Sequence, residues 1–160
     1  ILSYQAHDRL VTFSHPYLLW RDAVAKLPTE PVPWGSRALH NLAREYMYVS
    51  KPEKAVELID RCMTQYPDTF HCYFAKAAIL FELNGPDAAL PYFERAVVLN
   101  PRRDMAHQRL ALTLEKLGRV GEALVVLRNA SKLGFTGADI ELRRLMSKKP
   151  NKRQKIRYKI

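Results

Sequence analysis

Apolar residues recur at intervals of three and four along most of this chain, and the pattern itself repeats every 34 residues. Intervals of three and four place side chains on one face of an α-helix. Each period holds two such faces with turn residues between them, so the pattern predicts three consecutive helical hairpins. We place these hairpins at residues 36–69, 70–103 and 104–137.

The aligned positions of the three periods form columns of small and of large apolar residues. Small side chains allow two antiparallel helices to approach closely, and large ones fill the space between successive hairpins. We therefore expect the columns to form the core of the repeats. Their residues are Leu42, Ala43, Tyr46, Ala55, Ala77, Leu80, Ala89, Phe93, Ala96, Leu110, Ala111, Leu114, Ala123, Leu127 and Ala130.

Turn and breaker residues separate the expected helices. Residues 50–53, Ser-Lys-Pro-Glu, have the pattern of a capping box with Pro52 just inside the helix start. Gly118 is typical of the residue that follows a helix. Pro91 lies inside the second helix of the middle hairpin, where we expect a kink or a late start because proline cannot donate to the helix ladder.

The 34-residue period and its columns resemble the tetratricopeptide repeat, a helix–turn–helix unit that stacks into a right-handed superhelix. The resemblance covers residues 36–137 and implies an all-α solenoid. Leu39 and His107 stand where the family often has tryptophan, and Phe135 stands where it often has proline. Lys76 occupies a position that is usually large and apolar. Single repeats often lose one or two columns, so these departures leave the assignment intact.

The residues before the repeats, 1–35, are predicted to hold a degenerate N-terminal repeat or capping helices. Residues 16–28 resemble the second helix of a repeat, because Trp20 and Pro28 match its columns. The first helix of this unit would then lie within residues 3–13.

The residues after the repeats, 138–149, are predicted to form a capping helix, since a solenoid needs ends with a polar outer side. We expect its apolar side chains to cover the last hairpin, while Arg143 and Arg144 face water. The apolar residues concerned are Ile140, Leu142, Leu145 and Met146. Residues 150–160 are expected to be a disordered basic tail.

The start of the chain suggests a segment of a longer protein, because Ile1 replaces an initiator Met and no signal-peptide pattern follows. Residues 8–28 also resemble the junction of large multi-pass membrane proteins, glycosyltransferase-like in some, that carry tetratricopeptide repeats on the extracytoplasmic side. This resemblance implies that the chain is the accessory domain of a membrane-bound enzyme whose active site lies upstream, and that the chain itself lies on the periplasmic side of the membrane. A cytoplasmic location is the alternative.

Charge is concentrated at the end of the chain. The whole sequence has 26 basic and 16 acidic residues, a net charge of +10. Residues 143–160 contain nine Lys or Arg and no acid, which leaves residues 1–142 almost neutral. A neutral body disfavours nucleic acid as a partner. The stretch from Lys148 to Lys159 is a solvated end, a contact with an anionic membrane surface or a contact with nucleic-acid phosphates. The last is the least favoured, because Tyr158 is the only aromatic residue among its cations.

The sequence contains no arrangement typical of catalysis or of a cofactor. The five histidines lack the four-residue spacing of a helical metal site, and no phosphate loop or nucleophile elbow occurs. Two cysteines cannot build a zinc site or a disulfide framework. We therefore predict no enzyme activity, no metal and no cofactor.

Cys62 occupies a small-residue column and is expected to be a buried thiol. A disulfide with Cys72, ten residues later, is the alternative in an oxidising compartment. We disfavour that alternative because the two side chains are expected to point to different sides of the helices.

The resemblance implies a binding groove lined by the first helix of each hairpin. Candidate partner-binding residues lie one turn apart on the face that does not pack: Arg37, His40, Arg44, Tyr48, His71, Phe74, Phe81, Gln108 and Leu112. These residues favour an extended or helical peptide of acidic character, because aromatic anchors flanked by arginine dominate such interfaces. The alternative is that Phe74, Phe81 and Leu112 close the groove by packing within the stack.

Chaperone-binding members of the family hold a C-terminal carboxylate with a clamp of Lys, Asn, Asn, Lys and Arg. The corresponding residues here are His40, Arg44, Ala75, Met105 and Arg109, and only Arg109 agrees. The sequence therefore predicts a non-catalytic scaffold for a protein or peptide partner, without this clamp, present as a monomer or weak dimer.

Overall fold

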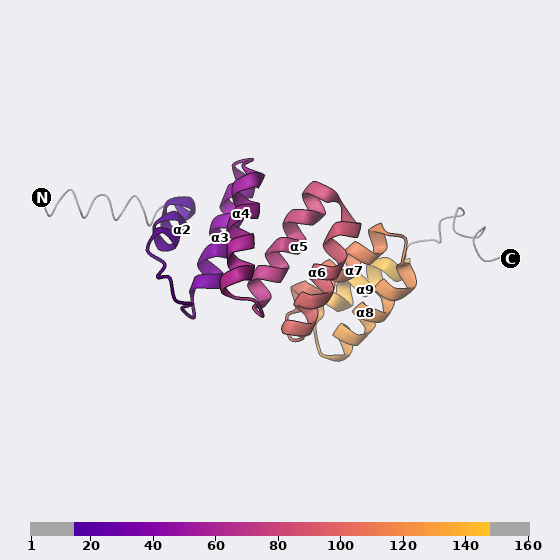
Figure 1. Ribbon diagram of the computed structural model, residues 1–160. Helices are drawn as coiled ribbons and strands as arrows, with labels where there is room; N and C mark the ends of the chain where they lie inside the picture. The colour runs from indigo at the N-terminus through magenta and orange to yellow at the C-terminus, as the bar shows by residue number, and fades with distance from the viewer. Residues whose placement is uncertain (1–14, 148–160) are drawn as a thin grey trace, which may run out of the picture. The chain divides into compact units, whose positions relative to one another are not determined.

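The computed structural model describes residues 15–147, and over that range every regular element is a helix (Figure 1). This confirms the predicted all-α class. The predicted helix within residues 3–13 and the basic tail lie outside the described residues. The helices are α2 (Pro16–Ala25), α3 (Gly35–Tyr48), α4 (Pro52–Gln65), α5 (Phe70–Asn84), α6 (Pro86–Leu99), α7 (Asp104–Lys116), α8 (Val120–Lys132) and α9 (Thr136–Ser147).

The chain divides into two compact units, residues 1–100 and residues 101–160. In the first unit α3 pairs with α4 and α5 pairs with α6, while α2 packs on α3 and α5 contacts both α3 and α4. In the second unit α7 pairs with α8, and α9 packs on both. Among the described residues no helix is long and apolar enough to span a membrane.

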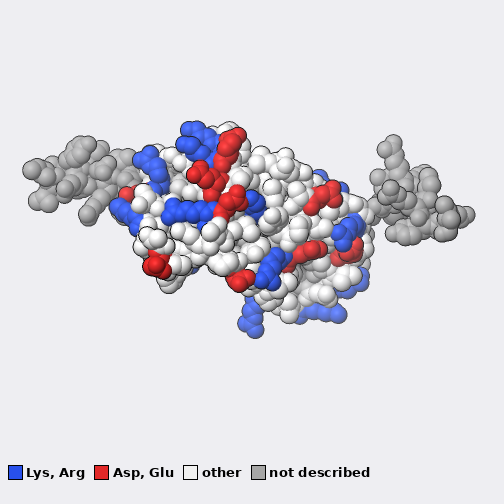
Figure 2. Space-filling model, viewed as in Figure 1, with Lys and Arg blue, Asp and Glu red and all other residues white. Residues whose placement is uncertain are grey.

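The core of each unit is built from the repeat columns. Thirteen of the fifteen column residues are buried, and Tyr46 and Leu80 are half-buried. Acidic and basic side chains are interspersed on the face of the molecule shown in Figure 2. The described residues therefore have an apolar interior and a surface on which acidic and basic side chains are mixed.

Three of the departures from the family's columns have partners that explain them. The Lys76 ammonium lies 2.5 Å from an Asp60 carboxylate oxygen of α4, so its stem packs while its charge is paired. His107 is buried, with Nε2 2.8 Å from the Pro101 carbonyl oxygen. Its ring centroid lies 5.7 Å from that of Phe135. His107 and Phe135, two of the departures, therefore pack against each other.

The predicted capping box at residues 50–53 is wrong. Ser50 has a φ of 54°, and its N–H donates to the Met47 carbonyl while the Lys51 N–H donates to the Tyr46 carbonyl. This is the Schellman arrangement that ends α3. Lys51 is the N-cap of α4 and makes no side-chain capping bond. Ser50 cannot begin α4 because its backbone already terminates α3.

Gly118 ends α7 with the same hydrogen-bond pattern and a φ of 77°, which confirms the predicted stop. The helix α6 begins at Pro86 and continues through Pro91, so the late start expected there is wrong. Pro91 lacks the N–H that would bond to the carbonyl four residues earlier. Because Pro91 is exposed, this gap in the helical hydrogen bonds lies at the surface.

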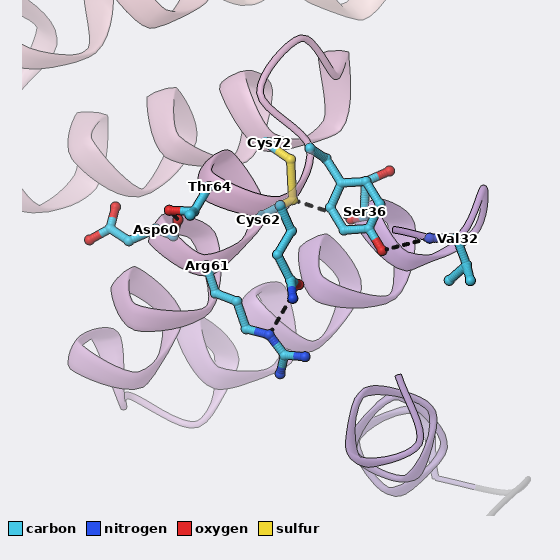
Figure 3. Close-up of a disulfide and its surroundings, with 9 residues drawn as sticks. Val32, Ser36, Asp60, Arg61, Cys62, Thr64 and Cys72 are labelled. Carbon is cyan, nitrogen blue, oxygen red and sulfur yellow. Dashed lines mark hydrogen bonds between the residues drawn. A yellow bond between two sulfur atoms is a disulfide. The ribbon is translucent and has the colours of Figure 1, made fainter. Parts of the chain in front are cut away.

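Cys62 and Cys72 form a disulfide, so the expected free thiol is wrong (Figure 3). Cys62 lies in the last turn of α4 and Cys72 in the first turn of α5, with their Cα atoms 5.6 Å apart. Because the connection between the two helices is short, the end of α4 lies next to the start of α5. The two cysteine side chains therefore face one another. Both cysteines are fully buried, and Cys62 Sγ lies 3.7 Å from the Ser36 carbonyl oxygen.

The helix α9 caps the second unit but exposes more apolar surface than expected. Leu145 is buried and Leu142 half-buried, whereas Ile140 and Met146 are 65% and 62% exposed. The expectation that both of these cover the last hairpin is therefore wrong. Leu145 and Ala138 alone are buried among the residues of α9, because only one stripe of a helix can face its support.

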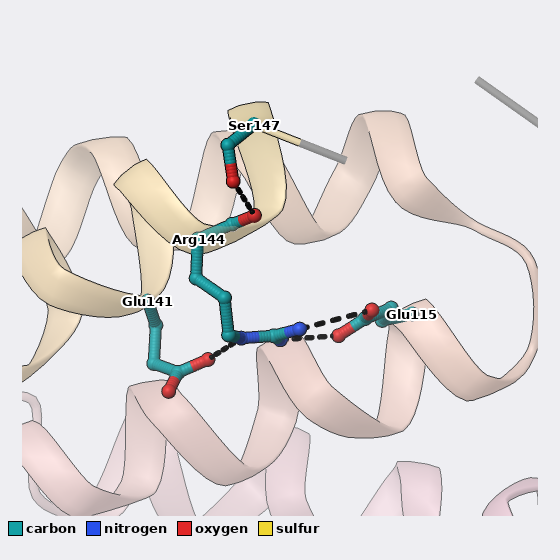
Figure 4. Close-up of polar contacts among 4 residues, drawn as sticks. All are labelled: Glu115, Glu141, Arg144 and Ser147. Atoms are coloured by element: carbon teal, nitrogen blue, oxygen red, sulfur yellow. Dashed lines mark hydrogen bonds and ion pairs between the residues drawn. The ribbon is translucent and has the colours of Figure 1, made fainter. Parts of the chain in front are cut away.

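Arg144 is half-buried instead of facing water (Figure 4). Its guanidinium donates two hydrogen bonds to the Glu115 carboxylate on α7 and one to Glu141. The hydrogen bonds from Glu115 and then Glu141 raise the pKa of Arg144. Arg143 is exposed as predicted and pairs with Asp139.

The start of α9 is held by an acid from the preceding hairpin. The N–H groups of Gly137 and Ala138 donate to the two Asp104 carboxylate oxygens, at 3.0 and 3.1 Å. A Cβ at Gly137 would lie 2.1 Å from Gln108 Nε2 and 2.6 Å from an Asp104 oxygen, so any larger residue would displace these two side chains. Asp104 thus stabilises the N-terminus of a helix 33 residues further along the chain.

Candidate partner-binding site

The nine residues predicted to bind a partner lie on three helices. Helix α3 carries Arg37, His40, Arg44 and Tyr48, α5 carries His71, Phe74 and Phe81, and α7 carries Gln108 and Leu112. Since α7 belongs to the second unit, we describe the candidate site on α3 and α5, which contact each other within the first unit.

A row of rings runs from α3 across α5. The His40 and His71 centroids are 5.9 Å apart, and the His71 ring meets Phe70 edge-on at 5.5 Å. Phe70 stacks on Phe74 at 5.3 Å, and Phe74 meets the buried Phe93 of α6 at 5.7 Å. These separations are typical of favourable aromatic pairs. The row is therefore a continuous, half-buried aromatic strip anchored at one end in the core.

Phe70 was missed by the sequence reasoning, although its spacing of four from Phe74 on one helix could have revealed it. Phe74 and Phe81 are both half-buried. The contact of Phe74 with Phe93 shows that part of its ring serves packing within its own hairpin. The remaining part is accessible, so the aromatic strip combines a packed and an open side.

His40 is a neutral side chain at physiological pH. Burial, followed by the charges of His71 and Arg44, lowers its pKa to about 4. Its Nδ1 atom is buried and has no hydrogen-bond partner among the described residues. The His40 ring therefore places a polar atom without a hydrogen-bond partner beside the aromatic strip.

The strip has a cationic edge. Arg37 and Arg44 are exposed on α3, and Arg44 lies 3.5 Å from Glu45, its neighbour in the chain. Tyr48 is 76% exposed at the end of the same helix. An apolar strip with exposed arginines beside it can take an apolar anchor and pair with acidic groups next to that anchor.

The two candidates on α7 are both half-buried. Gln108 packs against Gly137 at the start of α9, so part of its side chain supports the end of the second unit. Within residues 15–147 no group of three potential metal ligands comes together.

Comparison with known proteins agrees with this architecture. The model of the family described as bacterial transcriptional activator domain (BTAD) matches residues 34–148. Human tetratricopeptide repeat protein 7B is 30% identical over 112 residues, covering 68% of this chain and 13% of that protein. The uncharacterized protein y4yS of Sinorhizobium fredii is 30% identical over 78 residues, covering 49% of this chain and 43% of that protein. The chain thus spans only about an eighth of the human relative.

Solved structures show the same fold. The first tetratricopeptide domain of Spaghetti (RPAP3), bound to an HSP90 peptide, has a TM-score of 0.62 and 20% identity, covering 74% of this chain and 96% of that chain. MamA from AMB-1 has a TM-score of 0.56 and 26% identity, covering 74% and 67%. These comparisons confirm the tetratricopeptide fold and do not support the predicted membrane-enzyme parent. The chain belongs to the bacterial transcriptional activator domain family and folds as a tetratricopeptide-type helical repeat.

Proposed function

We propose that this chain is a non-catalytic module that holds a protein partner on the face formed by α3 and α5. The observation that supports this function is the aromatic strip from His40 to Phe74 with exposed Arg37 and Arg44 beside it. Tetratricopeptide-type folds commonly act as interaction scaffolds, and the RPAP3 neighbour is bound to a peptide.

The chemistry of the face favours a peptide segment with an apolar or aromatic anchor and acidic residues next to it. The half-buried rings offer apolar contact area, and the arginines offer charge-assisted hydrogen bonds. The family description, a bacterial transcriptional activator domain, supports a partner within a transcription-activating assembly.

A C-terminal peptide of the HSP90 kind is not the partner that we propose. Two of the clamp positions on the first unit are His40, whose burial keeps it neutral, and Ala75, which is buried. A neutral imidazole lacks the charge that lysine brings to a terminal carboxylate, and alanine lacks the amide donor of asparagine.

A triple variant tests the proposal. Peptides selected by display against the full chain are titrated by fluorescence anisotropy into the wild type and into Phe74→Leu, Phe81→Ala, Arg44→Glu. Loss of an apolar anchor contact and reversal of one charge should together weaken binding at least about tenfold. Phe74→Leu keeps most of the volume that faces Phe93 and so preserves the hairpin.

The matched control is Val125→Ala, Leu133→Ala, Arg128→Glu, which changes two apolar residues and one arginine, all of them exposed, on and next to α8. Circular dichroism should be the same for both variants and the wild type. If the selected peptides bind the α3–α5 variant as tightly as the wild type, the proposed site is wrong.

A further inference from the structure

A second polar cluster lies where α2, α3 and α4 meet, apart from the aromatic strip. Its centre is a pair of tyrosines, Tyr17 of α2 and Tyr46 of α3, with ring centroids 5.5 Å apart. The Arg21 guanidinium lies 5.6 Å from the Tyr17 centroid, and the Lys54 ammonium lies 5.6 Å from the Tyr46 centroid. Cation–ring contacts of this length are favourable and hold the charged groups over the rings. We call these residues, together with Lys51, the tyrosine–cation cluster.

The cations of the cluster form no ion pairs within the described part of the chain. Arg21, Lys51 and Lys54 are exposed, and none of them forms an ion pair with a carboxylate of residues 15–147. Lys76 of the same unit, by contrast, is paired. Glu57 is an acid near the cluster, since its charge raises the pKa of Tyr46. The three cations outnumber this carboxylate, which gives an excess of two positive charges over Glu57.

The cluster is also held in place before any ligand binds. The Tyr46 side chain lowers the pKa of Tyr17, and Tyr17 in turn raises the pKa of Tyr46, so the two hydroxyls lie close enough to act on each other. Arg21 and then Lys51 lower the pKa of Tyr17 further, which shows that both cations act at its oxygen. The Lys51 backbone is fixed by its hydrogen bond to the Tyr46 carbonyl, 2.9 Å long.

We propose that the tyrosine–cation cluster binds a phosphomonoester group carried by a partner protein. A phosphorylated side chain carries a charge of about −1.5 to −2 at pH 7, which matches the excess of two positive charges. A single carboxylate would neutralise only half of it. Duplex DNA is a poorer fit, because proteins that bind it contact about six to ten phosphates and this cluster offers three cations.

The test is an NMR titration of the full ¹⁵N-labelled chain. The probes are a capped Gly-Gly-phosphoserine-Gly-Gly peptide, the same peptide with Asp or unmodified Ser in the centre, inorganic phosphate and a short DNA duplex. The phosphoserine peptide should shift the amide signals of Arg21, Lys51 and Lys54 in a saturable way. It should bind at least about tenfold more tightly than the Asp and Ser peptides.

Two variants separate charge from fold. Arg21→Gln, Lys51→Gln, Lys54→Gln should abolish the saturable shifts, and the single change Lys54→Gln should reduce affinity without altering other signals. The control Arg102→Gln, Arg128→Gln, Lys132→Gln removes the same charge from exposed cations of the second unit and should bind like the wild type.

Four outcomes would overturn the proposal: no saturable shift at the cluster, equal binding by the cluster variant, equal affinity for inorganic phosphate and the peptide, or tighter binding of DNA at the same signals. The third would assign the cluster to free phosphate, and the fourth to nucleic acid. The triple variant at Phe74, Phe81 and Arg44 leaves the cluster intact, so failure here is distinguishable from failure of the α3–α5 face.

Discussion

Single residues with unusual local states show where this chain departs from an ideal repeat. Ser50 holds a left-handed backbone at a position where the third hairpin has Gly118. A residue with a Cβ pays roughly 1–2 kcal/mol for that conformation, while glycine adopts it freely. The turn between α3 and α4 is therefore formed at the expense of stability.

Ser50→Gly should stabilise the chain by about 0.5–1 kcal/mol, since glycine removes the strain but adds freedom to the unfolded chain. Urea unfolding followed by circular dichroism measures the change. The reverse substitution, Gly118→Ser, should lower stability by a similar amount. An unchanged or lower midpoint for Ser50→Gly would contradict the assignment of the turn.

His40 should make stability depend on pH. Its pKa is about 4 in the folded chain, against 6.5 for an unperturbed histidine. The unfolded chain therefore binds a proton first as the pH falls, and stability should drop by about 3 kcal/mol between pH 6.5 and pH 4. Above pH 6.5 the group has no effect on stability.

Urea unfolding at several pH values tests this prediction with His40→Phe, which places at residue 40 the side chain found at Phe74 one repeat later. The variant should lose much less stability than the wild type over this interval. Parallel curves for the two proteins would show that His40 is not buried as a neutral group.

Pairs of elements are held together by side chains that are distant in sequence. The disulfide joins α4 to α5, and Asp104 and Glu115 of α7 hold α9 through Gly137 and Arg144. Each of these contacts connects one hairpin to the next element. They supplement the apolar columns, which pack within hairpins and between them.

Reducing the Cys62–Cys72 bond should destabilise the first unit. Closing a loop across a sequence separation of 10 removes entropy from the unfolded chain and contributes about 3 kcal/mol. Urea midpoints measured with and without dithiothreitol should differ accordingly, with thiol titration to prove reduction. Cys62→Ala, Cys72→Ala should be insensitive to the reductant. Equal midpoints for the oxidised and fully reduced wild type would contradict a stabilising bond.

On the scale of the whole molecule, charge is divided between a mixed body and a basic end. Residues 148–160 contain seven Lys or Arg and no acid, so removing them lowers the net charge from +10 to +3. Figure 2 shows both signs of charge interspersed on the visible face of the body. Long-range attraction to anionic surfaces should therefore depend mainly on the end of the chain.

Deleting residues 148–160 should greatly weaken binding to vesicles that contain phosphatidylserine, because each basic residue near such a surface contributes about 1 kcal/mol. Co-sedimentation with anionic and with neutral vesicles measures the effect, and the neutral vesicles provide the control. Retained binding by the shortened chain would place the attraction in the body instead.

The sequence by itself determined the helical hairpins, because a 34-residue period with small and large columns is a local signal carried by spacing alone. Thirteen column residues are buried as a consequence. Tertiary structure decided the features that depend on two segments meeting in space. Helix packing decides that Cys62 faces Cys72 and that Arg144 pairs with Glu115. It also brings three cations close to Tyr17 and Tyr46. Periodicity describes one face of one helix, whereas these contacts require the relative position of two or three helices.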